Sequence, residues 1–95
     1  MTDTLIERAA SPPEIALSEA ETVLLDVSGA VYYTLRGTVA VRIWNLLARP
    51  QTAAELTQTL IDEFDVDRDT CEQQVGDFIR LLVEKGLLRT IERQS

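Results

Sequence analysis

Residues 23–47, VLLDVSGAVYYTLRGTVAVRIWNLL, constrain the fold more than any other part of the chain. They hold two runs of β-branched, aromatic and aliphatic residues, Val23–Val27 and Ala30–Leu35. Between them stands Ser28-Gly29, and a small residue followed by glycine is typical of a tight hairpin turn. The sequence therefore predicts two antiparallel strands joined by a short turn.

The length of that turn decides which side chains share a face of the sheet. If it holds two residues, Leu25 lies opposite Tyr32 and Val23 lies opposite Thr34. The alternate residues of both strands then point to the other face. A longer turn would shift this register and with it the face assignment.

After the second strand the apolar period changes from 2 to about 3.6, which predicts a helix. Gly37 or Thr38 can serve as its N-cap, and Pro50 follows within a few residues of its end. Trp44 is large enough to anchor a core from this helix. The apolar stripe of the helix consists of Val39, Ile43, Leu46 and Leu47.

Upstream of the hairpin, Glu14–Ser18 is a plausible first strand. Because sequential strands usually pair, we expect a three-stranded meander that leaves the strand 30–35 at one edge. Residues 1–13 show little periodicity and end in two prolines, so we expect a flexible N-terminal arm followed by one domain over residues 14–92.

Two further helices follow. Thr52 and Glu55 have the spacing of a capping box, and Asp67 is a good N-cap for the next helix. Gly86 is the expected C′ residue of that third helix, and residues 87–91 could form a short extended tail. The fold class is therefore α+β, a three-stranded antiparallel sheet followed by three helices. The third helix carries an apolar stripe of Cys71, Val75, Phe78, Ile79, Leu82 and Val83.

The residues that most catalytic sites need are missing from the composition. The chain has no histidine, and its four glycines form no phosphate-binding loop. The single cysteine, Cys71, fits a small buried hydrophobe and allows no internal disulfide. The acids Asp65, Asp67 and Asp69 begin like a calcium loop, but Thr70 stands where the loop needs glycine. We expect no catalytic residue, no cofactor and no metal.

Charge and hydropathy bear on partners and location. The formal net charge of −7 disfavours binding to nucleic acid. No window approaches the ~18 apolar residues of a membrane span, and the N-terminal residues lack the features of a secretory signal. We therefore expect a cytoplasmic protein without a membrane or nucleic-acid partner.

Four segments in this order and spacing resemble the PqqD-like domains, also called RiPP recognition elements. The resemblance covers Ile15 to Leu88, nearly the whole chain. Two positions depart from the pattern of many relatives: Arg36 replaces Asn, and Gln74 replaces Asp. Neither change touches an apolar position, but both make the peptide specificity harder to infer. The four segments are LLDVSGAVYYTL, AVRIWNLL, TAAELTQTLIDEFDVD and QVGDFIRLLVEKGLL.

The resemblance implies a small winged-helix-like domain that binds the leader segment of a ribosomally made precursor peptide and does no chemistry itself. The leader adds as a strand to the third strand, in the cleft beside the third helix. A free-standing copy is most similar to the recognition protein of lasso-peptide gene clusters, which works beside a separate cysteine protease, and we expect this chain to be a monomer. A PqqD-type peptide chaperone for a radical enzyme is the second reading.

The residues themselves support strand addition. An edge strand offers unpaired N–H and C=O groups, and Lys or Pro usually guards such an edge. The strand 30–34 contains neither, which fits an edge kept open for a peptide. Alternatively, a terminal segment, residues 1–13 or 87–91, covers this edge. For the residues of the third helix, the alternative is that they only pack in the core. The predicted peptide-binding residues are Ala30, Val31, Tyr32, Tyr33, Thr34, Val75, Phe78, Ile79 and Leu82.

A winged-helix DNA-binding regulator is the main alternative from another class. It would need a basic recognition helix, but in the third helix the acids outnumber the bases. A purely structural interaction module and a stand-alone enzyme are less favoured still. The sequence does not identify the leader, the final product or the partner enzymes.

Overall fold

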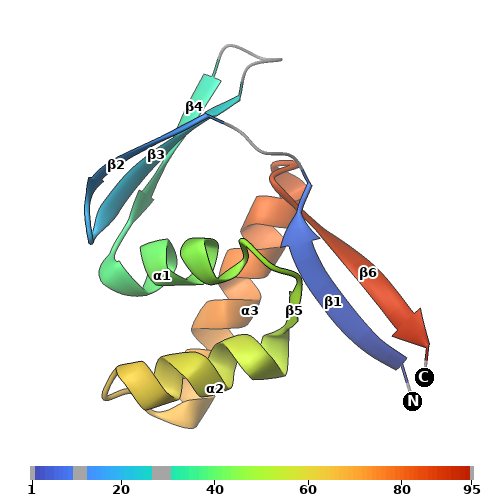
Figure 1. Cartoon of the computed structure of the whole chain (residues 1–95). Helices are drawn as coiled ribbons and strands as arrows, with labels where there is room; N and C mark the ends of the chain where they lie inside the picture. The colour runs from blue at the N-terminus through green and yellow to red at the C-terminus, as the bar shows by residue number, and fades with distance from the viewer. Residues whose placement is uncertain (1, 10–12, 27–30, 95) are drawn as a thin grey trace.

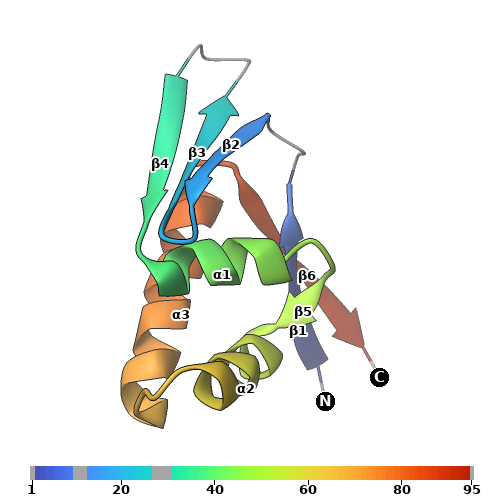
Figure 2. The ribbon, with the colours of Figure 1, turned by 60° about the vertical axis from the view of Figure 1, so that its left-hand side comes forward.

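Two small antiparallel sheets lie at different sides of a group of three helices (Figure 1). The structure is a computed structural model that describes residues 2–9, 13–26 and 31–94. The sheet that bears on function contains β2 (Glu14–Ser18), β3 (Glu21–Asp26) and β4 (Val31–Arg36) in the order β2-β3-β4. The predicted meander is therefore present, and β4 lies at its edge (Figure 2). The predicted Ser28-Gly29 turn lies outside the described residues.

The register between β3 and β4 is the one expected for a two-residue turn. Leu25 lies opposite Tyr32 and Val23 lies opposite Thr34. The alternate residues face the helices: Leu24 is 1% exposed, whereas Tyr32 on the other face is 69% exposed. The sheet thus has one face on the core and one face open to solvent.

The three helices are α1 (Thr38–Leu46), α2 (Ala53–Glu63) and α3 (Arg68–Glu84). The backbone of Gly37, the N-cap of α1, has a φ of 104°, which favours glycine. In α2 the predicted capping box is present, because Thr52 Oγ1 accepts from the Glu55 N–H and Thr52 N–H donates to the Glu55 carboxylate.

Both ends of α3 follow the sequence signals. The Asp67 carboxylate accepts a hydrogen bond from the Thr70 N–H, as expected of an N-cap. At the other end Gly86 has a φ of 77° and donates to Val83, while Leu87 donates to the carbonyl of Leu82. These two bonds form a Schellman motif, which ends the helix and turns Leu87 back into the core.

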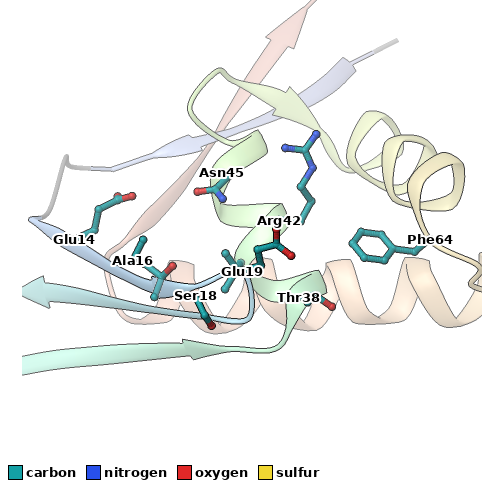
Figure 3. A pocket seen from close by; sticks show the side chains of 10 residues that line it. Glu14, Ala16, Ser18, Glu19, Thr38, Arg42, Asn45 and Phe64 are labelled. Carbon is teal, nitrogen blue, oxygen red and sulfur yellow. The ribbon is translucent and has the colours of Figure 1, made fainter.

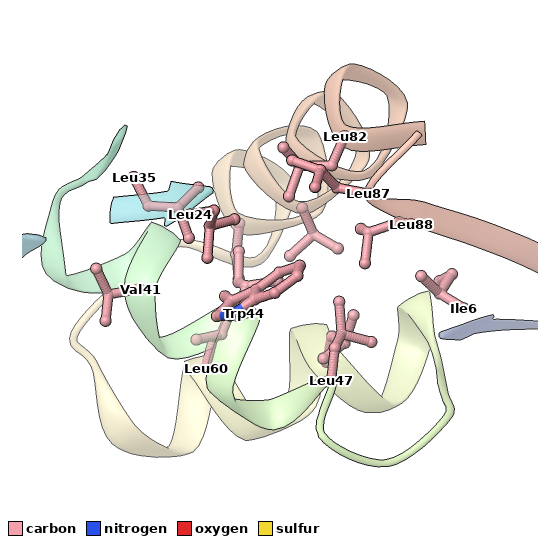
Figure 4. Packing of buried hydrophobic residues seen from close by; sticks show 14 residues of the cluster. Ile6, Leu24, Leu35, Val41, Trp44, Leu47, Leu60, Leu82, Leu87 and Leu88 are labelled. Carbon is pink, nitrogen blue, oxygen red and sulfur yellow. The ribbon is translucent and has the colours of Figure 1, made fainter. Parts of the chain in front are cut away.

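Trp44 occupies the centre of the core between the sheet and α3 (Figure 4). Its side chain has 0% exposure, as predicted for a core anchor, and its Nε1–H donates to Glu14 Oε2 at 3.0 Å. This hydrogen bond satisfies the one polar group of a buried indole. The surrounding buried side chains come from every helix and from both sheets, so a single core holds the chain together.

The terminal segments form the second sheet, which the sequence did not predict. Its strands are β1 (Thr2–Arg8), β5 (Gln51–Thr52) and β6 (Leu88–Gln94), in the order β5-β1-β6. Where a flexible arm was expected, β1 pairs along its whole length with β6. Residues 88–91 of the expected tail form the start of β6, and the tail covers the core, since Leu87 and Leu88 are buried.

Two side chains of β1 explain why the N-terminal segment docks. Ile6 is 3% exposed and belongs to the core. The Arg8 guanidinium lies 4.1 Å from the centroid of the Trp44 ring, donates to the Trp44 carbonyl at 2.6 Å and lies 3.5 Å from the Glu14 carboxylate. Burial lowers the pKa of Arg8, and attraction to Glu14 offsets part of this shift. Cation–π contact and the ion pair therefore compensate for desolvation of the guanidinium.

Replacing Ile6 by alanine tests whether β1 belongs to the folded core. We expect Ile6→Ala to lower the free energy of unfolding by about 2–4 kcal/mol, because it removes a buried aliphatic side chain and leaves a cavity. Leu17→Ala is the matched control, since Leu17 is 58% exposed and should cost less than about 0.5 kcal/mol. Urea unfolding measures both; equal effects of the two variants would mean that β1 does not dock.

Candidate functional site: the open edge of β4

A hydrogen bond at the end of the β3–β4 ladder next to α1 shows which backbone groups of β4 are bonded to β3. The Gly37 N–H donates to the Ala20 carbonyl at 2.7 Å, one position beyond the last pair of the ladder. In an antiparallel ladder, hydrogen-bonded pairs alternate with pairs that are not bonded to each other. Because Gly37 is bonded to β3, this alternation means that the N–H and C=O groups of Leu35 and Tyr33 are also hydrogen-bonded to β3.

The residues in between, Tyr32, Thr34 and Arg36, therefore direct their N–H and C=O groups away from β3. Among the described residues no strand receives them, because β1 and β6 pair in the other sheet. In the described part of the chain the terminal segments thus do not cover this edge, which was the alternative left open by the sequence. The edge is a free template for an added strand.

One face of α3 lies beside the open edge of β4. Gln74, Phe78, Leu81 and Lys85 follow one another at i, i+4, i+7 and i+11, so they share a helix face. The Lys85 ammonium lies 5.0 Å from the centroid of the Tyr33 ring, which joins the C-terminal end of this face to β4. Leu81 is 40% exposed and offers apolar surface there. We call the space between these four residues and β4 the β4–α3 groove.

The N-terminal end of the groove contains a pocket of about 340 Å³. Its floor is the start of α1, and Phe78 of α3 forms an apolar wall. It lies where β4 turns into α1, so a strand added to β4 would run past its opening. The lining residues are Arg36, Gly37, Thr38, Val39, Ala40, Ile43, Gln74 and Phe78.

The structure distributes the predicted residues of β4 over its two faces and its edge. Tyr32 is exposed, whereas Tyr33 and Thr34 are half-buried. The backbone of Val31 belongs to β4 and pairs with Asp26. Ala30 lies outside the described residues. The exposed ring of Tyr32 stands on the solvent face of the sheet, so its backbone, and not its side chain, belongs to the groove.

The predicted residues of α3 do not all reach the groove. Phe78 is half-buried and lines the pocket. Val75 and Leu82 are 1% and 0% exposed, which makes them core residues behind the groove wall. Ile79 is half-buried and, one residue after Phe78, points about 100° further around the helix. The sequence prediction placed four of the six stripe residues at the site, and two of these four, Val75 and Leu82, are buried in the core.

Three residues of this helix face are not among the predicted peptide-binding residues: Gln74, Leu81 and Lys85. Two of them are polar, so a search for an apolar stripe passes over them. Their spacing from Phe78, at i−4, i+3 and i+7, was nevertheless readable from the sequence. The residues that share a helix face with Phe78 therefore describe the wall better than the apolar stripe does.

A second pocket, of about 480 Å³, lies at the other edge of the sheet, between β2 and α1 (Figure 3). Polar residues dominate its rim, and Arg42 there makes a two-bond ion pair with Glu63 at 2.7 Å. This contact raises the pKa of Arg42 and lowers that of Glu63. The neighbouring edge strand β2 has a register shift between Ala16 and Ser18, which interrupts its ladder. Although this pocket is larger, β4 is the more regular template.

The one thiol of the chain is packed in the core. Cys71 is 1% exposed, burial raises the pKa of its thiol, and its Sγ donates to the Thr57 carbonyl at 3.8 Å. It therefore behaves as a packed thiol and not as a nucleophile. The described residues contain no cluster of side chains that could hold a metal ion. None of the described helices is both long and apolar enough to cross a membrane.

Comparison with known proteins gives two matches. The family model described as "Coenzyme PQQ synthesis protein D (PqqD)" matches residues 21–88. A solved structure described as "TbiB1 in Complex with the TbiA(beta) Leader Peptide" is 31% identical in sequence, with a TM-score of 0.77; the match covers 87% of this chain and 94% of that chain. No curated protein matches the chain.

Amide exchange tests the alternation along β4. We expect the amides of Tyr32 and Thr34 to exchange much faster than those of Tyr33 and Leu35, because only the latter pair is hydrogen-bonded to β3. Residue-resolved hydrogen exchange by NMR on the free protein measures this difference. Equal and strong protection of all four amides would mean that another segment occupies the edge.

Proposed function

The chain belongs to the PqqD family, and from this premise we propose that it binds the leader segment of a ribosomally made precursor peptide. The leader adds as a fourth strand to β4 and is presented there to a processing enzyme. The observation that carries this proposal is the free edge of β4, with the backbone groups of Tyr32, Thr34 and Arg36 directed outward beside the helix face that carries Phe78 and Leu81. The similarity to TbiB1, which was solved with a leader peptide, supports it.

Binding of this kind draws on two sources of free energy. Main-chain hydrogen bonds to β4 hold any extended peptide, each at about 0.5–1.5 kcal/mol net. Every second side chain of the peptide then points into the β4–α3 groove, where Phe78 and Leu81 offer apolar contact. Burial of one peptide leucine or phenylalanine there contributes about 1.5–3 kcal/mol. The backbone gives affinity, and the groove selects among sequences.

The processing partner is, in this proposal, a separate cysteine protease that removes the leader, as in lasso-peptide biosynthesis. The similarity to TbiB1 over most of both chains supports the lasso-peptide type. The description of the family model favours a second candidate, a PqqD-type peptide chaperone for a radical enzyme. The two candidates share the leader site and differ in the enzyme that receives the peptide. Co-purification of the tagged protein with the enzymes encoded beside it distinguishes them.

The proposed role involves no catalysis by this chain. Incubated alone with the precursor encoded beside it, the protein should leave the peptide mass unchanged, because the sequence holds no histidine and the one thiol is buried. Mass spectrometry over several hours checks this expectation. A mass shift that appears with this protein alone, and not with buffer, would contradict the binding role.

A proline at Thr34 tests strand addition directly. Thr34→Pro removes an N–H that points away from β3 and breaks no bond of the β3–β4 ladder, so leader affinity should fall at least tenfold with little loss of stability. Ala16→Pro is the matched control, because the same alternation directs the Ala16 N–H outward from the other edge, β2.

Isothermal titration with the synthetic leader measures affinity, and thermal unfolding of both variants checks the fold. If Thr34→Pro binds the leader as tightly as the unchanged protein while Ala16→Pro does not, the peptide lies on β2. If both variants keep full affinity, neither edge takes part, and strand addition is wrong.

A further inference from the structure

Two cations flank the open edge of β4 in a chain whose net charge is −7. Lys85 stands in the groove, with its ammonium 5.0 Å from the centroid of the Tyr33 ring. Arg36 stands at the end of the strand with a side chain that is 81% exposed, and its guanidinium lies 3.6 Å from the Glu21 carboxylate. Exposed ion pairs of this kind are weak, so Arg36 remains available to a peptide carboxylate.

The two cations lie on opposite faces of the sheet. Tyr33 shares its face with Leu35, which is buried against the helices, so Lys85 meets β4 on the groove side. Arg36 lies opposite Glu21 across the ladder and shares its face with Thr34, so its side chain projects from the solvent face, although the residue also borders the pocket at the end of the groove. Tyr33 and Arg36 are three residues apart, about 10 Å along a strand.

We infer that the peptide bound by β4 carries two acidic side chains three residues apart, one received by Lys85 and the other by Arg36. In an added strand the residue opposite Tyr33 points into the groove, and the residue opposite Arg36 points to the solvent face. An odd separation is what places two side chains of a strand on opposite faces. This inference rests on the proposed function and specifies the chemical class of its peptide.

The geometry also fixes what lies between the two acids. The peptide residue opposite Leu35 points into the groove near Phe78 and the pocket, so it is apolar. The residue opposite Thr34 points to solvent and is unrestricted. The signature is therefore acid-x-apolar-acid for a parallel strand and acid-apolar-x-acid for an antiparallel one.

The surrounding acids make these two positions selective. Asp77 lies on α3 next to the wall and pairs with Arg80 at 3.4 Å, and Glu84 lies one residue before Lys85. At physiological salt the net negative charge is screened over about 8 Å, so the two cations act locally. An acid placed elsewhere on the peptide meets like charge without a compensating contact, which is how repulsion contributes to specificity.

Selection from a display library of random 12-residue peptides tests this inference. The library is selected on the unchanged protein, and clones that fail to bind Thr34→Pro are kept as dependent on the β4 edge. We expect these clones to be enriched in two acids three residues apart with an apolar residue between them. For a purified clone, Lys85→Gln or Arg36→Gln should each reduce affinity about two- to fivefold, the size of an exposed ion pair.

Charge reversal tests direct contact, because a residue with only a structural role would not change which peptide sequences are selected. Selection on Lys85→Glu should replace the groove-side acid by Lys or Arg and keep the other acid, and Arg36→Glu should do the converse. Arg68→Glu is the control on the same helix, because Arg68 contacts Gln58 of α2 and lies away from the groove. It should leave the enrichment unchanged.

The outcomes separate this inference from the proposed function. Clones that depend on the β4 edge but show no paired acids, or whose preference survives both charge reversals, overturn the inference and leave the function standing. A selection that yields no clone dependent on the edge overturns the proposed function and the inference with it.

Discussion

The alternation of hydrogen bonds between β3 and β4 is the constraint on which the rest of the site depends. β3 lies in the middle of its sheet and uses its backbone groups on both sides, whereas β4 has a partner on one side only. Every second residue of β4 is therefore left with an N–H and a C=O directed outward. The same alternation determines where the side chains point. Those on the face of Leu35 point to the helices, and those on the face of Thr34 point to solvent. This two-residue alternation therefore determines both which backbone groups can bind a peptide and which face of the sheet contacts the peptide side chains.

The core keeps this edge in place and keeps the terminal segments away from it. Trp44 packs between the sheet and α3, and the hydrogen bond from its indole to Glu14 ties α1 to β2. Arg8 stacks on the same ring and fastens β1 on the other side of the core, where β6 pairs with it. A terminal strand that is bound in this way is not free to lie on β4. The docking of β1 therefore leaves the edge of β4 free of the N-terminal strand.

The parts of the fold that could be predicted are those whose signals are local. The strand pair with its register, the capping box at Thr52 and the buried Trp44 all follow from periodicity or from residues a few positions apart, and the structure confirms them. The pairing of β1 with β6 joins residues that are 80 or more positions apart, and Thr2–Arg8 shows no clear alternation that would indicate a strand. At the site, the composition of residues 30–34 predicted an open edge, and β4 has one partner among the described strands. Which residues of α3 contact a peptide stays a prediction. Apolar residues of α3 serve the core first, so Val75 and Leu82 lie behind the wall, while Leu81 and the polar Gln74 and Lys85 form it.

The central claim is that a leader peptide becomes the fourth strand of the β2-β3-β4 sheet. Isotope-filtered NMR of the labelled protein with unlabelled leader measures this most directly, because cross-strand contacts between backbone protons arise only from strands that are paired. The account predicts such contacts between the peptide and the backbone of Tyr32, Thr34 and Arg36, together with side-chain contacts to Phe78 and Leu81. Contacts confined to β2, to β6 or to the solvent face of the sheet would contradict it.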